Sequence, residues 1–124
     1  MGLFKKTTKP SQQAYAVVTG AGSGIGQSFA LALGKRGGTV VCADINLAAA
    51  EKTVALLAEH GAKAYAVACD VGKAEQVAEL AEQAEQLMQH PVTLVINNAG
   101  VGLGGKFDEL SLEDWQWVTH VNLW

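Results

Sequence analysis

The sequence predicts an α/β fold whose strands and helices alternate as βαβαβαβα, the first half of a doubly wound parallel sheet. Its short apolar runs lack the polar alternation of half-exposed strands, as expected for strands buried on both faces of a sheet. Segments with apolar residues at helical spacing separate these runs. Such alternation implies right-handed crossover connections, with helices on both faces of the sheet.

The expected elements follow one another without an internal repeat or a linker. The first two helices should stop near Gly37 and Gly61, where a left-handed residue commonly caps a helix. The third helix has an apolar stripe opposite a glutamate-rich face, and Pro91 is expected to end it. The stripe consists of Val77, Leu80, Ala81, Ala84, Leu87 and Met88. The strands are expected at residues 14–18, 39–43, 64–68 and 93–97.

Composition limits the classes of protein to which the chain can belong. Its 124 residues suffice for one domain with a core, expected at residues 14–124 behind a flexible leader at residues 1–13. A 49% hydrophobic content and a net charge of −3 argue against nucleic-acid binding, and no export or membrane segment is recognisable. Cys42 and Cys69 lack metal-ligand spacing and fall in apolar runs. We therefore expect no metal site, reduced buried thiols and a cytoplasmic protein.

A glycine-rich stretch, VVTGAGSGIG at residues 17–26, lies between the first expected strand and a helix that should begin near Ile25. Glycine lets the backbone approach a ligand closely, and a helix N-terminus attracts anions, so this junction favours phosphate. A Walker loop is excluded because no Gly-Lys-Ser/Thr follows, and the spacing G-x-G-x-x-G does not fit. The pattern present is T-G-x-x-x-G-x-G. An ordinary glycine turn is the alternative.

Asp44 follows the second expected strand directly. A carboxylate at this point can accept hydrogen bonds from both hydroxyls of an adenosine ribose and repels a 2′-phosphate. Neither Ser23 nor Ile45 supplies a positive charge that would offset the repulsion, so the sequence favours NAD over NADP. A cap for the following helix is the alternative role of Asp44.

Polar residues also follow the third and fourth expected strands. Asp70 ends the third run, where parallel strands present ligands, but a turn residue would look the same. The segment NNAG, residues 97–100, ends the fourth run. Its amides are suited either to hydrogen bonds across strands or to contact with a ligand.

Together these motifs resemble those of the short-chain dehydrogenase/reductase family, over residue 14 to the end. They are Thr19-Gly20-x-x-x-Gly24-x-Gly26, Asp70-Val71 and Asn97-Asn98-Ala99-Gly100. The resemblance implies a Rossmann-like fold and an NAD-dependent oxidoreductase of an alcohol/carbonyl pair. It places cofactor contacts at Thr19, Gly20, Gly22, Ser23, Gly24, Ile25, Gly26, Asp44, Asp70, Val71, Asn97, Ala99 and Gly100. In the family the glycines shape the pyrophosphate loop, the carboxylate after the second strand holds the ribose, and Asp-Val borders the adenine.

The last segment, VTHVNLW, is similar to the family's next helix, whose asparagine, here Asn122, supports a proton-relay water. Ser111 and Asp114 form a capping box for this helix, which in the family often joins subunits and so implies a homo-oligomer. The family's catalytic Tyr-x-x-x-Lys is not present, since Thr19 and Cys69 stand where lysine would follow each tyrosine.

We therefore expect the cofactor-binding half of a dehydrogenase, inactive by itself. A non-catalytic NAD-binding or interaction module is the alternative, and the NNAG segment disfavours a third, a domain for another adenosine ligand.

Overall fold

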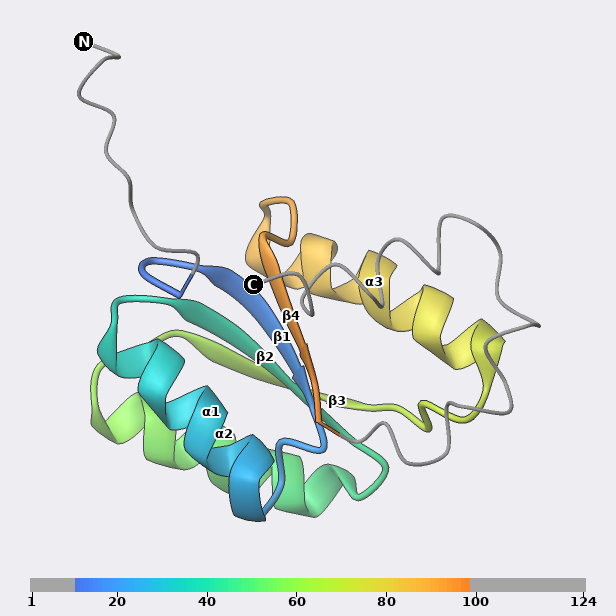
Figure 1. Ribbon diagram of the computed structural model, residues 1–124, viewed down its shortest axis with the longest axis horizontal. Coiled ribbons are helices and arrows are strands. Elements are labelled where there is room, and N and C mark those ends of the chain that lie inside the picture. Colours follow the sequence, from blue (N-terminus) through green and yellow to red (C-terminus); the bar gives the residue numbers. More distant parts are fainter. Residues whose placement is uncertain (1–10, 99–124) are drawn as a thin grey trace, which may run out of the picture.

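The structure is a computed structural model that describes residues 11–98 of the chain. Strands and helices alternate along these residues, as the sequence predicts (Figure 1). They are β1 (Tyr15–Thr19), α1 (Gly24–Lys35), β2 (Thr39–Asp44), α2 (Leu47–Glu59), β3 (Ala64–Ala68), α3 (Ala74–Met88) and β4 (Leu94–Asn97). The expected last helix, together with residues 1–10 and 99–124, lies outside the described residues.

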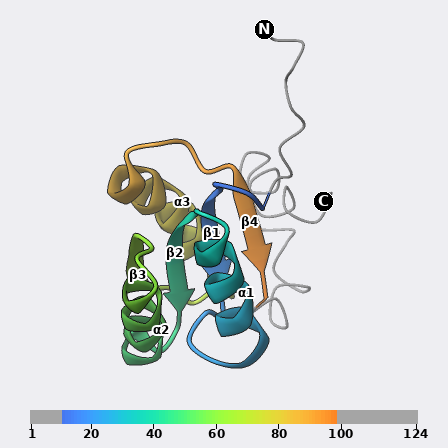
Figure 2. The ribbon, with the colours of Figure 1, turned by 90° about the vertical axis from the view of Figure 1, so that its left-hand side faces the viewer.

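The four strands form one parallel sheet in the order β3-β2-β1-β4. Val17 at the centre of β1 is level with Val41 of β2 on one side and with Val95 of β4 on the other. Figure 2 shows β4 at the sheet edge opposite β3. Growth of the sheet therefore reverses after β3, as in a doubly wound fold, and the prediction of this fold class is confirmed.

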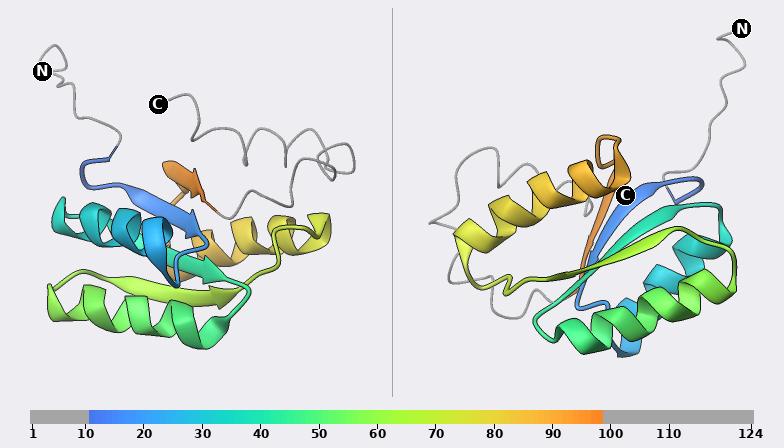
Figure 3. Two further views of the ribbon diagram at one scale, coloured as in Figure 1. Left: turned by 60° about the horizontal axis from the view of Figure 1, so that its bottom comes forward. Right: turned by 180° about the vertical axis from the view of Figure 1, so that it is seen from behind.

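Helices cover both faces of the sheet in three layers (Figure 3). On one face, α1 and α2 pack on a core that includes Ala16, Val18 and Cys42. On the other, α3 packs on a second core, to which β1 and β2 contribute Val17 and Val41. Adjacent residues of β1 and β2 thus serve opposite cores, which explains why these strands are apolar throughout.

The first two helices end just before the predicted glycines, whereas α3 ends before a residue other than glycine. Gly37 and Gly61 have φ values of 85° and 80°, as the predicted left-handed caps require. The prediction that Pro91 ends α3 is wrong in detail, because the helix stops at Met88 and Gln89 takes the left-handed conformation at φ 56°. The N–H of Gln89 donates to the carbonyl of Glu85 at 2.8 Å, which closes the last turn ahead of the proline.

The structure differs from two other expectations, one in α3 and one in the N-terminal leader. Leu87, predicted on the apolar stripe of α3, is 39% exposed and lines a surface pocket beside β3. It lies on the flank of the helix, whereas Val77, Leu80, Ala84 and Met88 face the sheet. Residues 11–13, expected in the leader, form a turn in which the N–H of Gln13 donates to the Arg36 carbonyl at 3.0 Å.

Between residues 11 and 98, no helix is both long and apolar enough to cross a membrane. The same residues contain no group of three or more His, Cys, Asp and Glu side chains placed to hold a metal ion. Cys42 and Cys69 are free and buried, as predicted. Burial raises the pKa of Cys42 to about 12, which makes its thiol a poor nucleophile at neutral pH.

Candidate functional site

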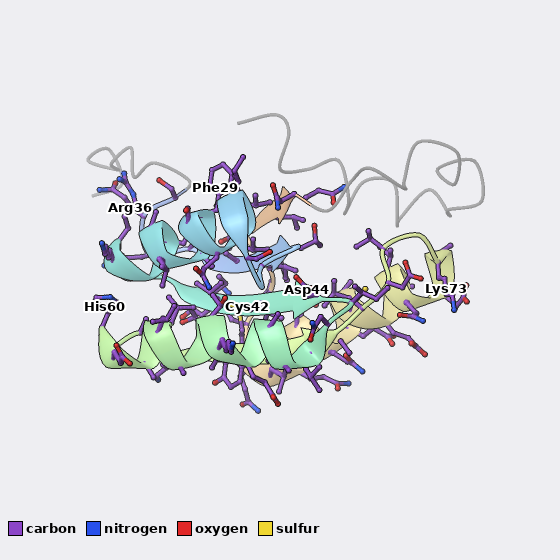
Figure 4. All side chains as sticks on the ribbon, turned by 90° about the horizontal axis from the view of Figure 1, so that it is seen from below. Phe29, Arg36, Cys42, Asp44, His60 and Lys73 are labelled. Carbon is purple, nitrogen blue, oxygen red and sulfur yellow. The ribbon has the colours of Figure 1, made fainter. Side chains whose placement is uncertain are left out.

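The polar residues singled out in the sequence gather at the carboxyl edge of the sheet. There β1 leads into the glycine loop, residues 20–23, which ends at the N-terminus of α1. Asp44 ends β2, Asp70 follows β3, and Asn97 ends β4. Figure 4 shows Asp44 at the opposite end of α1 and α2 from Arg36 and His60, which follow those helices. In open parallel sheets this edge is where ligands bind.

The glycines of the loop have separate structural roles. Gly20 and Gly24 have φ values of 64° and 58°, which other residues rarely adopt. Gly26 is buried in the first turn of α1, and a Cβ there would run into the carbonyl oxygen of Gly20. Residues Ser23, Gly24 and Ile25 are exposed, so the N-terminus of α1 faces solvent at the tip of the loop. A close-packed loop thus presents its backbone at a helix N-terminus, which is suited to an anion.

The carboxylate of Asp44 supports two segments of backbone. Its Oδ2 accepts the N–H of Gly22 and its Oδ1 accepts the N–H of Asn46, both at 2.9 Å. Asn46, rather than Asp44, caps α2, because its side chain accepts the N–H of Ala49 at 3.1 Å. Each carboxylate oxygen has a second lone pair, so Asp44 keeps acceptor capacity for a ligand.

A pocket of about 220 Å³ opens between the ends of β1, β2 and β3. Its lining consists of Gly20, Asp44, Ile45, Cys69, Asp70, Val71 and Gly72. Ile45 is 72% exposed, more than any other large hydrophobic side chain between residues 11 and 98.

Asp70 is held in a local turn. Its Oδ1 accepts the N–H of Gly72 at 2.9 Å, and its own N–H donates to Oε1 of Gln76 at 2.7 Å. The N–H of Cys69 donates to the carbonyl of Asp44 at 3.0 Å, which ties this wall of the pocket to the end of β2. Burial, with the nearby charges of Asp70 and Glu79, raises the pKa of Cys69 to about 11, so this thiol is protonated at neutral pH.

Asn97 makes a contact across strands, one of the two uses left open by the sequence. Its Oδ1 accepts the hydroxyl of Thr19 at 2.9 Å, and the two residues are level in β4 and β1. Thr19 is 3% exposed, so its end of this hydrogen bond is buried. The amide of Asn98 reaches the carbonyl of Gly20 at 3.5 Å. Ala99, Gly100 and Asn122 lie outside the described residues.

Sequence reasoning missed three residues that support this edge. Thr53 and Gln27 lie behind the glycine loop, and Gln76 holds the backbone of Asp70. For Thr53 a signal exists in the sequence, because it is a polar residue on the buried stripe of α2 between Ala50 and Leu57. Gln27 and Gln76 resemble ordinary surface glutamines of a helix.

Comparison with known proteins agrees with this geometry. The family model described as short chain dehydrogenase matches residues 14–124. A cyclohexanol dehydrogenase of Acinetobacter sp. is 42% identical over 109 residues, which cover 87% of this chain and 43% of that protein. A CLA biosynthesis dehydrogenase/reductase of Lactiplantibacillus plantarum is 38% identical over 106 residues, 86% of this chain and 37% of that protein.

Among solved structures, a short chain dehydrogenase/reductase from Burkholderia phymatum in complex with NAD superimposes with a TM-score of 0.70 at 40% identity. The match covers 94% of this chain and 41% of that one, so the chain spans less than half the length of these relatives. The family match over residues 14–124, on a parallel sheet with a glycine loop at its carboxyl edge, shows that the chain belongs to the short-chain dehydrogenase/reductase family of oxidoreductases.

Proposed function

We propose that this chain binds NAD at the carboxyl edge of its sheet, as the cofactor-binding part of an oxidoreductase that acts on an alcohol/carbonyl pair. The observation that carries the proposal is the position of Asp44, whose carboxylate lines the pocket while it also holds the glycine loop. When bound, NAD supplies the nicotinamide ring that accepts or gives up hydride.

The loop fits the pyrophosphate of NAD. Gly20 and Gly24 carry the backbone through left-handed conformations, and Gly26 leaves no room for a side chain between α1 and the loop. Ser23, Gly24 and Ile25 are exposed at the N-terminus of α1, where the helix dipole favours negative charge. The Ser23 side chain makes no capping hydrogen bond, so it is open to a phosphate oxygen.

The pocket fits the adenosine half. Ile45 and Val71 supply apolar contacts suited to a planar base, and Asp70 supplies a polar edge. Asp44 would accept the ribose hydroxyls and repel a 2′-phosphate, since neither Ser23 nor Ile45 is cationic. We therefore assign NAD rather than NADP as the preferred cofactor.

Toward the nicotinamide end the assignments follow the family. Asn97 steadies the sheet beside the cofactor through Thr19, and its geometry supports this role. Ala99 and Gly100 are proposed to lie near the second ribose, and Asn122 to support a proton-relay water. A small alcohol or carbonyl compound is the proposed substrate.

We also propose a cellular location and an oligomeric state for the protein. Both cysteines are free and buried, in keeping with the reducing cytoplasm. A homo-oligomer is proposed on the family likeness alone.

The test is a calorimetric titration of the chain with NAD and with NADP, for the unchanged protein, Asp44→Arg and Glu59→Arg. We expect NAD to bind more tightly than NADP. Asp44→Arg should weaken the binding of NAD and narrow or reverse the preference for NAD over NADP. Glu59→Arg makes the same charge change at the far end of α2 and should leave both affinities unchanged. Unaltered NAD affinity in Asp44→Arg would remove Asp44 from the site.

A further inference from the structure

Thr53 is a polar side chain in the interior that the proposed function leaves unused. It lies on α2 among the buried residues of that helix and is 0% exposed. Its hydroxyl donates to the carbonyl oxygen of Ala21 at 2.7 Å and accepts from Nε2 of Gln27 at 3.0 Å. One hydroxyl therefore links α2, the glycine loop and α1, with both its donor and one acceptor position used.

The contact of Thr53 is made to a particular peptide unit. The carbonyl of Ala21 and the N–H of Gly22 belong to the same planar peptide, and in a trans peptide these groups point in opposite directions. Thr53 holds the carbonyl end at 2.7 Å, and Oδ2 of Asp44 holds the N–H end at 2.9 Å. The plane is thus pinned from both sides, and rotation of one end must displace the other.

Packing around Gly22 leaves this peptide little freedom. A Cβ on Gly22 would lie 2.5 Å from Cβ of Ala49 and 2.8 Å from Oδ2 of Asp44, so the backbone sits directly against α2 and the carboxylate. The preceding N–H, that of Ala21, donates to the carbonyl of Ala43 at 3.1 Å. The N–H and carbonyl of Ala21 and the N–H of Gly22 are therefore held by β2 and α2, while Ser23 and Gly24 stay exposed.

We propose that Thr53 is a positioning residue for the cofactor. Through the Ala21–Gly22 peptide it sets the orientation of the Asp44 carboxylate and of the loop that receives pyrophosphate. This inference rests on the proposed function for its ligand, but the mechanical link between Thr53 and Gly22 stands on the hydrogen bonds alone. Gln27 assists by donating to the same hydroxyl, which leaves the hydroxyl proton directed at Ala21.

The test compares Thr53→Val, Thr53→Ser and Val54→Ala in the full chain. Thr53→Val keeps the shape and removes both hydrogen bonds, and Thr53→Ser restores the hydroxyl. Val54→Ala, at the next residue of α2, trims packing of the same core and leaves the Thr53 hydroxyl in place. NAD affinity is measured by titration at a temperature where circular dichroism shows each variant folded, and hydrogen exchange of the Gly22 amide is measured by NMR relative to the Val41 amide.

We expect Thr53→Val to weaken NAD binding about fivefold, as the loss of the hydrogen bond to Ala21 implies, and to speed exchange of the Gly22 amide relative to the Val41 amide. Thr53→Ser should restore both values, and Val54→Ala should leave both unchanged. Should Thr53→Val fail to fold, Gln27→Met serves in its place. It should give a smaller loss of NAD affinity and a smaller increase in exchange of the Gly22 amide.

Two results would overturn the inference. One is unchanged NAD affinity and unchanged Gly22 exchange in folded Thr53→Val, and the other is a serine variant as impaired as the valine variant. A wild-type chain that does not bind NAD would instead overturn the proposed function, and the Gly22 amide, which needs no ligand, would still decide whether Thr53 holds the peptide.

Discussion

The N–H of Gly22 donates to Oδ2 of Asp44 at 2.9 Å, so a carboxylate at the end of β2 also braces the loop that follows β1. The bond spans neighbouring parallel strands at the edge where the pocket opens. Substitutions of Asp44 intended to change cofactor preference will therefore disturb the loop as well. The stability of Asp44 variants without cofactor isolates the effect on the loop.

Asp44→Ala should lower the free energy of unfolding more than Asp44→Asn does. Alanine leaves the buried N–H of Gly22 without its acceptor, at a cost of about 1–3 kcal/mol, and leaves the exposed N–H of Asn46 to water, whereas asparagine can keep one of the two bonds. Urea denaturation of both variants measures the difference. Stabilities equal to that of the unchanged chain would show that water replaces the carboxylate at the loop without loss.

Gly26→Ala should destabilise the chain more than Gly24→Ala. A methyl group on Gly26 meets backbone, the carbonyl of Gly20, which cannot move aside without shifting the loop. The position of Gly24 has open space but a φ of 58°, so alanine there costs only about 1–2 kcal/mol of backbone strain. Thermal denaturation of the two variants gives the order, and the reverse order would contradict the close approach at Gly26.

Thr19 and Asn97 should be energetically coupled. In a double-mutant cycle of Thr19→Val and Asn97→Ala, we expect an interaction free energy of about 1 kcal/mol for the 2.9 Å hydrogen bond. A second cycle pairs Thr19→Val with Thr93→Val, at the other end of β1, where Thr93 accepts the N–H of Tyr15. That cycle should be additive, and coupling of the same size in both would deny a specific bond to Asn97.

Stability should fall with rising pH above pH 9, where thiols of the unfolded chain begin to ionise. Burial raises the pKa of Cys42 from 9.0 to about 12 and that of Cys69 from 9.0 to about 11. The stabilisation is thus complete below pH 9 and is lost as pH approaches 11 to 12, by at most about 1.4 kcal/mol per pH unit for each thiol.

The measurement is urea denaturation between pH 8 and 10.5, with Cys42→Ala as the comparison. This variant should show a shallower decline with pH, because one thiol no longer distinguishes the folded from the unfolded state. Parallel declines would mean that Cys42 ionises equally in both states.

The sequence predicted the fold, and with it the edge of the sheet at which its polar residues gather, because both depend on local signals. Apolar runs without alternation located the strands to within a residue, and the glycine pattern located the first junction. The sequence could not predict the hydrogen bond between Asp44 and Gly22 or that between Thr53 and Ala21, because these contacts depend on how β2 and α2 pack beside the loop. The prediction that Leu87 belongs to the apolar stripe of α3 failed because helical spacing does not show how far the sheet extends beneath the helix.

The glycine loop precedes, in the chain, the segments from β2, α2 and β4 onward that hold its backbone. Ala43 and Asp44 hold its backbone from β2, Thr53 holds it from α2, and Asn98 reaches Gly20 from a separation of 78 residues. Closing the chain over such a distance has an entropic cost that is offset when β4 pairs with β1. On the ribosome, the segment around Gly20 must therefore wait until β4 has emerged before this edge can take its final shape.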